Sequence, residues 1–61
     1  SRMLVETSCG RVRVEAIANT ADEAYLHART RRLVMVVVPG AVWLCSARVA
    51  ERLQRAGYEV L

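Results

Sequence analysis

One stretch decides the fold: Leu33-Val34-Met35-Val36-Val37-Val38-Pro39-Gly40-Ala41-Val42-Trp43-Leu44-Cys45-Ser46. Its first six residues are all apolar, and four of them are valine. A short β-branched run without polar interruption is typical of a strand that is buried on both faces. Residues 33–38 are therefore predicted to form the central strand of a sheet.

The Pro39-Gly40 pair after this strand has two interpretations, which lead to different topologies. In the first, residues 41–56 form a crossover helix, and the order becomes ββαβαβ with residues 58–61 as the last strand. In the second, the pair occupies the centre of a type II turn, residues 41–45 return as a second strand, and Ser46 caps a shorter helix.

Helical periodicity favours the second interpretation. A helix over residues 41–56 would have one apolar face, but Trp43 and Leu44 would project well away from it. A helix capped by Ser46 is amphipathic throughout and stops at Gly57, where a glycine is expected just beyond a helix end. We therefore expect a hairpin followed by a helix.

Residues 3–18 are predicted to form another β-hairpin. Ser8-Cys9-Gly10 supplies the turn, and residues 11–17 alternate polar and apolar side chains with a period of two. This period indicates a strand with one solvated face. The polar side chains expected to face water are Arg11, Arg13 and Glu15.

A short helix follows this hairpin. Residues 20–23 match the S/T-x-x-E capping box, with Thr20 as the N-cap, and Asp22 and Glu23 lie at the positive end of the helix dipole. Three arginines crowd its last turn, where cations complement the exposed carbonyl groups. The residues expected to face inward are Ala21, Ala24, Tyr25 and Ala28, with Leu26 to one side.

Together these elements predict a single α+β domain over residues 1–61. The expected order is ββαββα with a short C-terminal strand, in one small sheet with both helices on one face. Two strand-strand-helix units about 30 residues apart also suggest an internal repeat. Such a repeat is compatible with a symmetric assembly.

Length and composition limit the possible classes of protein. The chain has 61 residues, of which 54% are hydrophobic, and a chain this small buries only about 60% of its unfolded surface. We therefore expect a homo-oligomer or a complex. The longest apolar run, residues 33–45, is shorter than the roughly 20 residues of a membrane span. With no evident signal peptide, and with Cys9 and Cys45 in no zinc or disulfide pattern, we expect a cytoplasmic protein.

Catalysis, metal binding and cofactor binding are not expected. His27 is the only histidine, and no further metal ligands are grouped around it. Ser8 and Cys9 have no base or orienting acid nearby in the sequence, and Gly40 belongs to no phosphate-binding glycine motif. The pattern predicts a non-enzymatic protein with no small-molecule substrate.

The basic residues point to an anionic partner. All nine are arginine, the net charge is +3, and the pI is about 9.5. Arginine binds phosphate through a planar, bidentate fork, although codon usage in a GC-rich genome would also explain the absence of lysine. The candidate nucleic-acid-binding residues are Arg48, Arg52 and Arg55, a stripe on the second helix, and Arg29, Arg31 and Arg32, a cluster at the end of the first.

Both arginine groups also have a purely structural explanation. The stripe could be a solvated helix face on which Glu51 and Arg55 form an ordinary i,i+4 ion pair. The cluster could serve only to complement the carbonyl end of the first helix.

Residues 43–53, WLCSARVAERL, resemble the opening of excisionase-type and related winged helix-turn-helix DNA-binding domains. In that family a tryptophan-leucine pair precedes a helix with a V-A-x-x-L core, here Val49-Ala50 and Leu53. The resemblance implies DNA binding through a recognition helix that follows. Residues 54–61 predict a helix end and a strand instead, so no element is left to enter the major groove. We do not assign the chain to this family.

Trp43 is the strongest candidate for contact with a partner protein. In a strand, its side chain lies on the face opposite Val42, where it could meet another chain or simply pack in the core. A terminal strand with an uncovered edge is also a template for association. The candidate protein-interface residues are Trp43, Leu44, Val60 and Leu61.

We interpret the sequence as a small regulatory or accessory binding module that binds the phosphate backbone of nucleic acid. The alternative is a protein-interaction module, such as an inhibitor, an antitoxin-like protein or an assembly adaptor, which acts as a dimer through its apolar sheet face. A third interpretation is a fragment of a larger α/β enzyme.

Overall fold

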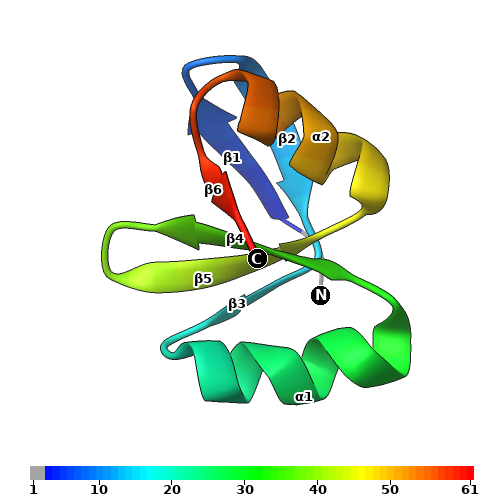
Figure 1. The fold of residues 1–61 in the computed structure, drawn as a ribbon. Coiled ribbons are helices and arrows are strands. Elements are labelled where there is room, and N and C mark those ends of the chain that lie inside the picture. The colour runs from blue at the N-terminus through cyan, green and yellow to red at the C-terminus, as the bar shows by residue number, and fades with distance from the viewer. Residues whose placement is uncertain (1–2) are drawn as a thin grey trace.

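A four-stranded antiparallel sheet lies at the centre of the fold, which a computed structural model describes for residues 3–61 (Figure 1). Its strand order is β3-β5-β4-β6, and a separate two-stranded sheet pairs β1 with β2. The α+β class and the order ββαββα with a C-terminal strand are confirmed, with the second predicted strand divided in two. The elements are β1 (Met3–Thr7), β2 (Gly10–Val14), β3 (Ala16–Ala18), α1 (Ala21–Arg31), β4 (Val34–Val38), β5 (Ala41–Cys45), α2 (Ala47–Arg55) and β6 (Glu59–Val60).

The hairpin of β4 and β5 is confirmed, and the crossover helix over residues 41–56 is wrong. Val38 pairs directly with Ala41, so Pro39 and Gly40 alone form the turn. Gly40 has a φ of +79°, the value that a type II turn requires at its third residue. In a strand, the Trp43 side chain packs on one face of the sheet. A helix over residues 41–56 would have directed it away from the apolar face of that helix.

Both faces of this hairpin are apolar, and a different helix covers each. Val36 of β4 and Cys45 of β5 belong to one buried cluster, with α2 and the β1–β2 hairpin. Val42 and Leu44 of β5 belong to a second cluster, with α1. The helices therefore lie on opposite faces of the sheet (Figure 1). The expectation that they share one face is wrong, because two unbroken apolar faces each need a cover.

The single predicted sheet is also wrong, because the chain bends at Glu15. The Glu15 backbone N–H donates to the Leu44 carbonyl over 2.8 Å, while the strands on either side pair with different partners. Val12 and Val14 pack into the cluster with α2, and Ala18 packs into the cluster with α1. A period of two continues through the bend, so the alternation alone cannot reveal it.

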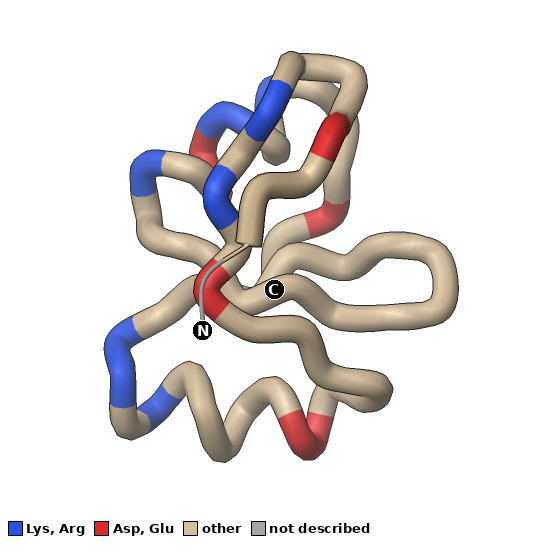
Figure 2. The backbone as a smooth tube through the Cα atoms, turned by 180° about the vertical axis from the view of Figure 1, so that it is seen from behind, with Lys and Arg blue, Asp and Glu red and all other residues tan. Residues whose placement is uncertain are grey.

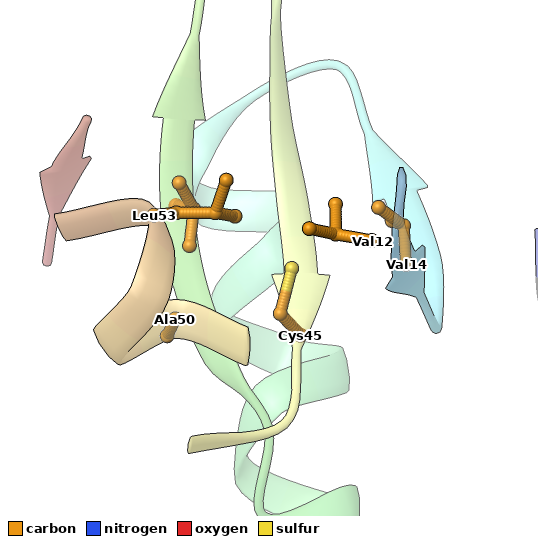
Figure 3. Packing of buried hydrophobic residues seen from close by; sticks show 6 residues of the cluster. Val12, Val14, Cys45, Ala50 and Leu53 are labelled. Atoms are coloured by element: carbon orange, nitrogen blue, oxygen red, sulfur yellow. The ribbon is translucent and has the colours of Figure 1, made fainter. Parts of the chain in front are cut away.

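The first cluster is built from three layers of side chains (Figure 3). Leu53 and Ala50 project from α2, Val12 and Val14 project from β2, and Cys45 of β5 lies between them. Ten hydrophobic residues are buried within residues 3–61, and none of them is aromatic. The core is therefore small.

The predicted helix ends are confirmed. The backbone N–H of Glu23 donates to Thr20 Oγ1 over 3.2 Å, and that of Val49 donates to Ser46 Oγ over 3.3 Å. After α2, the Gly57 N–H donates to the Gln54 carbonyl and the Tyr58 N–H donates to the Leu53 carbonyl. This pair of bonds is the Schellman motif, with Gly57 at its left-handed position.

The predicted inward face of α1 is only half right. Ala24 is buried and Ala28 partly buried, but Ala21 is exposed and Tyr25 is 54% exposed. The two inward alanines are four residues apart and let the helix backbone lie close to Val42 and Leu44. The Tyr25 side chain lies outside this contact, where its ring meets the guanidinium group of Arg29.

Neither helix in residues 3–61 is long and apolar enough to cross a membrane.

The end of α1 generates a first prediction. Arg32 caps the helix in the left-handed conformation, with a φ of +56°, which is costly for any residue with a Cβ. We expect Arg32→Gly to raise the free energy of unfolding by about 0.5–1 kcal/mol, after the greater unfolded-state freedom of glycine is deducted. Urea titration measures the free energy of unfolding. Arg31→Gly is the control, since it removes the same charge from inside the helix and should lower stability. Equal stabilities of the two variants would contradict strain at Arg32.

The two thiols generate a second prediction. Burial, assisted by the charge of Glu15, raises the pKa of Cys45 from 9.0 to about 11, whereas Cys9 is half-buried in the β1–β2 turn. At pH 8, a thiol reagent should modify Cys9 in the folded protein and Cys45 only after unfolding, and Cys9→Ser should remove the fast reaction. Because the folded-state pKa is raised, stability should also fall as the pH rises from 9 toward about 11. Rapid modification of Cys45 would contradict its burial.

Candidate nucleic-acid interface

The second helix carries its three arginines on the side away from the core. Ala50 and Leu53 are buried, and this fixes the rotation of the helix about its axis. The three arginines at i, i+4 and i+7 then lie together on the outer side. They are Arg48, Arg52 and Arg55, and all are exposed.

These arginines differ in what they contact. Arg52 donates from Nη2 to the backbone carbonyl of Cys9 over 3.1 Å. Arg55 Nη2 lies 3.8 Å from Glu51 Oε2, a long and solvent-exposed ion pair that contributes little. Among the described residues, the Arg48 side chain makes neither a hydrogen bond nor an ion pair. Arg48 is therefore the arginine of the stripe most available to a ligand.

The contact of Arg52 brings the turn of the β1–β2 hairpin beside α2. The hydroxyl of Thr7 holds this turn, because Oγ1 donates to the Gly10 carbonyl over 2.7 Å and accepts from the Cys9 backbone N–H over 3.2 Å. The Cys9 carbonyl is thereby left to accept from Arg52. No local sequence pattern predicts this contact, because the two residues are 43 positions apart.

Two further arginines join the candidate surface through this hairpin. Arg11 and Arg13 point outward from β2 and are exposed, as predicted, while Glu15 is half-buried. Arg11 Nε lies 3.4 Å from Glu6 Oε1 on the paired strand. Val12 and Val14 of β2 face α2, so the alternate residues Arg11 and Arg13 lie on the face of the hairpin turned away from α2. We use the term arginine surface for the exposed arginines on the two outer sides of the layer formed by α2 and the β1–β2 hairpin, which are Arg11, Arg13, Arg48, Arg52 and Arg55. The alternating pattern marked Arg11 and Arg13 only as solvent-facing, because the packing of their hairpin against α2 joins residues far apart in the sequence.

The arginine positions gather on one side of the molecule (Figure 2). The blue segments of β2, of α2 and of the end of α1 all lie toward the left of that view. The β4–β5 hairpin, on the opposite side, has no charged position. The arginines therefore lie away from the uncharged β4–β5 hairpin, with Glu6 and Glu51 among them.

The second predicted cluster lies at the C-terminal end of α1. Arg29, Arg31 and Arg32 are all exposed. The guanidinium carbon of Arg29 lies 5.7 Å from the centre of the Tyr25 ring, and the Arg32 backbone N–H donates to the Ala28 carbonyl. Asp22 and Glu23 occupy the first turn of the same helix. The Arg32 backbone therefore caps α1, and the three arginine side chains of the cluster are exposed.

The predicted protein-interface residues are distributed over both faces of the sheet. Trp43 is half-buried, and its ring stacks on Tyr58 with centroids 6.0 Å apart. Leu44 is fully buried in the cluster with α1, so its side chain lies in the core. Val60 is half-buried in β6, and Leu61 is 55% exposed. An exposed residue that the sequence did not single out, Ile17, lies directly opposite Trp43 on β3.

Within residues 3–61, no three histidine, cysteine, aspartate or glutamate side chains come close enough to hold a metal ion. His27 is exposed on α1.

No protein-family model matches this chain, and neither a curated protein nor a solved structure matches it.

The Arg52 contact generates a third prediction. Arg52→Ala should speed amide hydrogen exchange at Cys9 by about two- to fivefold, the effect of losing a bond that contributes about 0.5–1 kcal/mol. NMR exchange rates measure it. Arg48→Ala is the matched control, since it removes the same charge from the same helix and should leave the rate unchanged. Equal acceleration in both variants would show that charge, not the bond, governs the turn.

Proposed function

We propose that this chain is a small, non-enzymatic module that binds the phosphate backbone of nucleic acid through the arginine surface. The observation that supports it most strongly is that both outer sides of the layer formed by α2 and the β1–β2 hairpin carry exposed arginines, away from the uncharged β4–β5 hairpin (Figure 2). An isolated helix stripe is often just a solvated face. Five exposed arginines on two elements of one layer, with an uncharged hairpin beside them, are harder to explain that way.

The geometry of α2 suits a phosphate backbone. From Arg48 to Arg55 the helix rises about 10 Å at 1.5 Å per residue, which is about the rise of three nucleotide steps along the duplex axis at 3.4 Å each. Each guanidinium can donate two parallel hydrogen bonds to one phosphate. The ion pairs with Glu6 and Glu51 are long and exposed, so a phosphate can displace them at little cost.

The proposed binding is independent of base sequence. Gly57 ends α2, and β6 follows it, so the second helix that a helix-turn-helix protein inserts into the major groove does not follow here within residues 3–61. Arginine contacts to phosphate position a protein on the duplex and carry no sequence information directly. The expected partner is therefore any duplex, bound mainly by charge.

The salt dependence of binding tests this proposal. With a fluorescent mixed-sequence DNA duplex, the logarithm of the association constant should fall against the logarithm of salt concentration. The expected slope is about −3 if only the three α2 arginines each neutralise one phosphate, and about −4.5 if Arg11 and Arg13 do so as well. Anisotropy titrations between low and physiological salt measure it. Arg48→Ala should reduce the magnitude of the slope by about one.

Gln54→Ala is the control for this experiment, because Gln54 is an exposed, uncharged residue of the same helix. It should bind as the unmodified protein does. Undetectable binding at low salt, or an Arg48→Ala slope equal to that of the control, would contradict the proposal.

A further inference from the structure

One end of the sheet carries an apolar patch on the face that α2 covers. Trp43 belongs to the α2 cluster, Ile17 lies opposite Trp43 in the register, and Val38 lies opposite Ala41. Because alternate residues of a strand share a face, these four side chains and Tyr58 lie on the same side of the sheet. We call Ile17, Val38, Ala41, Trp43 and Tyr58 the apolar patch.

The patch is only partly covered. Ile17 is 45% exposed, and the other four residues are half-buried. The buried members of the α2 cluster, Val36 and Cys45 among them, lie further along β4 and β5, away from the Pro-Gly turn. Apolar side chains are therefore partly exposed at the end of the sheet near the Pro-Gly turn, where α2 no longer covers this face.

The patch adjoins a free strand edge. β3 is the terminal strand of the four-stranded sheet, and β5 is its only strand partner in the described part of the chain. The backbone groups on its outer edge are a template for pairing with another strand. A second copy satisfies this edge with no new sequence, because an antiparallel strand can pair with itself about a two-fold axis.

Charge favours this surface over the arginine-bearing surfaces for contact between two copies. Two chains that each carry a net charge of +3 repel one another. The patch contains no charged residue, and its β4–β5 hairpin projects to the side opposite the arginine positions (Figure 2). Contact between two copies at this patch keeps their arginine surfaces apart. It also buries further apolar area, which adds to a small core that has no buried aromatic residue within residues 3–61.

We infer that the apolar patch and the edge of β3 bind a second copy of this chain. Ile17 lies at the two-fold axis, opposite Ile17 of the second copy, and the β3 strands pair antiparallel. The two four-stranded sheets become one continuous sheet. The two patches meet beside the axis, and both arginine surfaces stay accessible. This dimer does not depend on the proposed nucleic-acid binding, which is measured separately.

Sedimentation equilibrium across about 1 μM to 1 mM protein tests the inference. We expect a mass of twice the 6.8 kDa chain at the upper end of this range. Ile17→Glu places two carboxylates opposite each other at the axis, where like charges repel, and should weaken dimerisation at least tenfold. Leu26→Glu is the matched control, since Leu26 is 63% exposed on α1, on the other face of the sheet, and should leave the dimer intact.

A second measurement covers the case in which Ile17→Glu fails to fold. Trp43 is the only tryptophan, so its emission in the unmodified protein should shift to longer wavelength on dilution as the patch becomes solvated. A monomeric mass at 1 mM would overturn the inference. A dimer that Leu26→Glu disrupts as strongly as Ile17→Glu would overturn it too, and so would emission that does not change while the dimer dissociates.

Discussion

The fold depends on one constraint, which is that both faces of the β4–β5 hairpin are apolar and both must be kept from water. Val42 and Leu44 face α1, while Val36 and Cys45 face α2 and the β1–β2 hairpin. Burial of apolar surface is the main term that favours folding, and a chain of 61 residues has little of it to spare. The chain therefore places its helices on opposite faces, and the bend at Glu15 takes it from the layer beside α2 into the central sheet.

The same arrangement separates two kinds of surface. The layer of α2 and the β1–β2 hairpin is joined by the buried cluster around Leu53 and by the bond from Arg52 to the Cys9 carbonyl. Its outer sides carry the arginine surface. The β4–β5 turn extends beyond this layer and exposes uncharged, apolar side chains around Trp43. The proposed nucleic-acid contact and the proposed contact with a second copy use different residues, so the two proposals are compatible.

Sequence patterns predicted the local structure well and the tertiary structure poorly. The caps at Thr20 and Ser46 and the Pro-Gly turn depend on residues close together in the chain, and all were predicted. The bend at Glu15 was missed because a period of two reads the same on either side of it. Tyr25 was placed inward because helical spacing does not say how close a neighbouring sheet lies. The outward position of the α2 arginines was predicted from helical spacing, but the packing of the β1–β2 hairpin against α2, with the bond from Arg52 to Cys9, joins residues too far apart for a local pattern.

The most direct test is whether DNA contacts the arginine surface and leaves the apolar patch unchanged. Backbone amide chemical shifts of the protein, recorded by NMR during titration with a mixed-sequence DNA duplex at low salt, report every contact in one experiment. The account predicts perturbations in α2 and β2, centred on Arg48 and Arg13, with Ile17, Ala41 and Trp43 unmoved. Perturbations concentrated on the β4–β5 hairpin, or none at all, would contradict it.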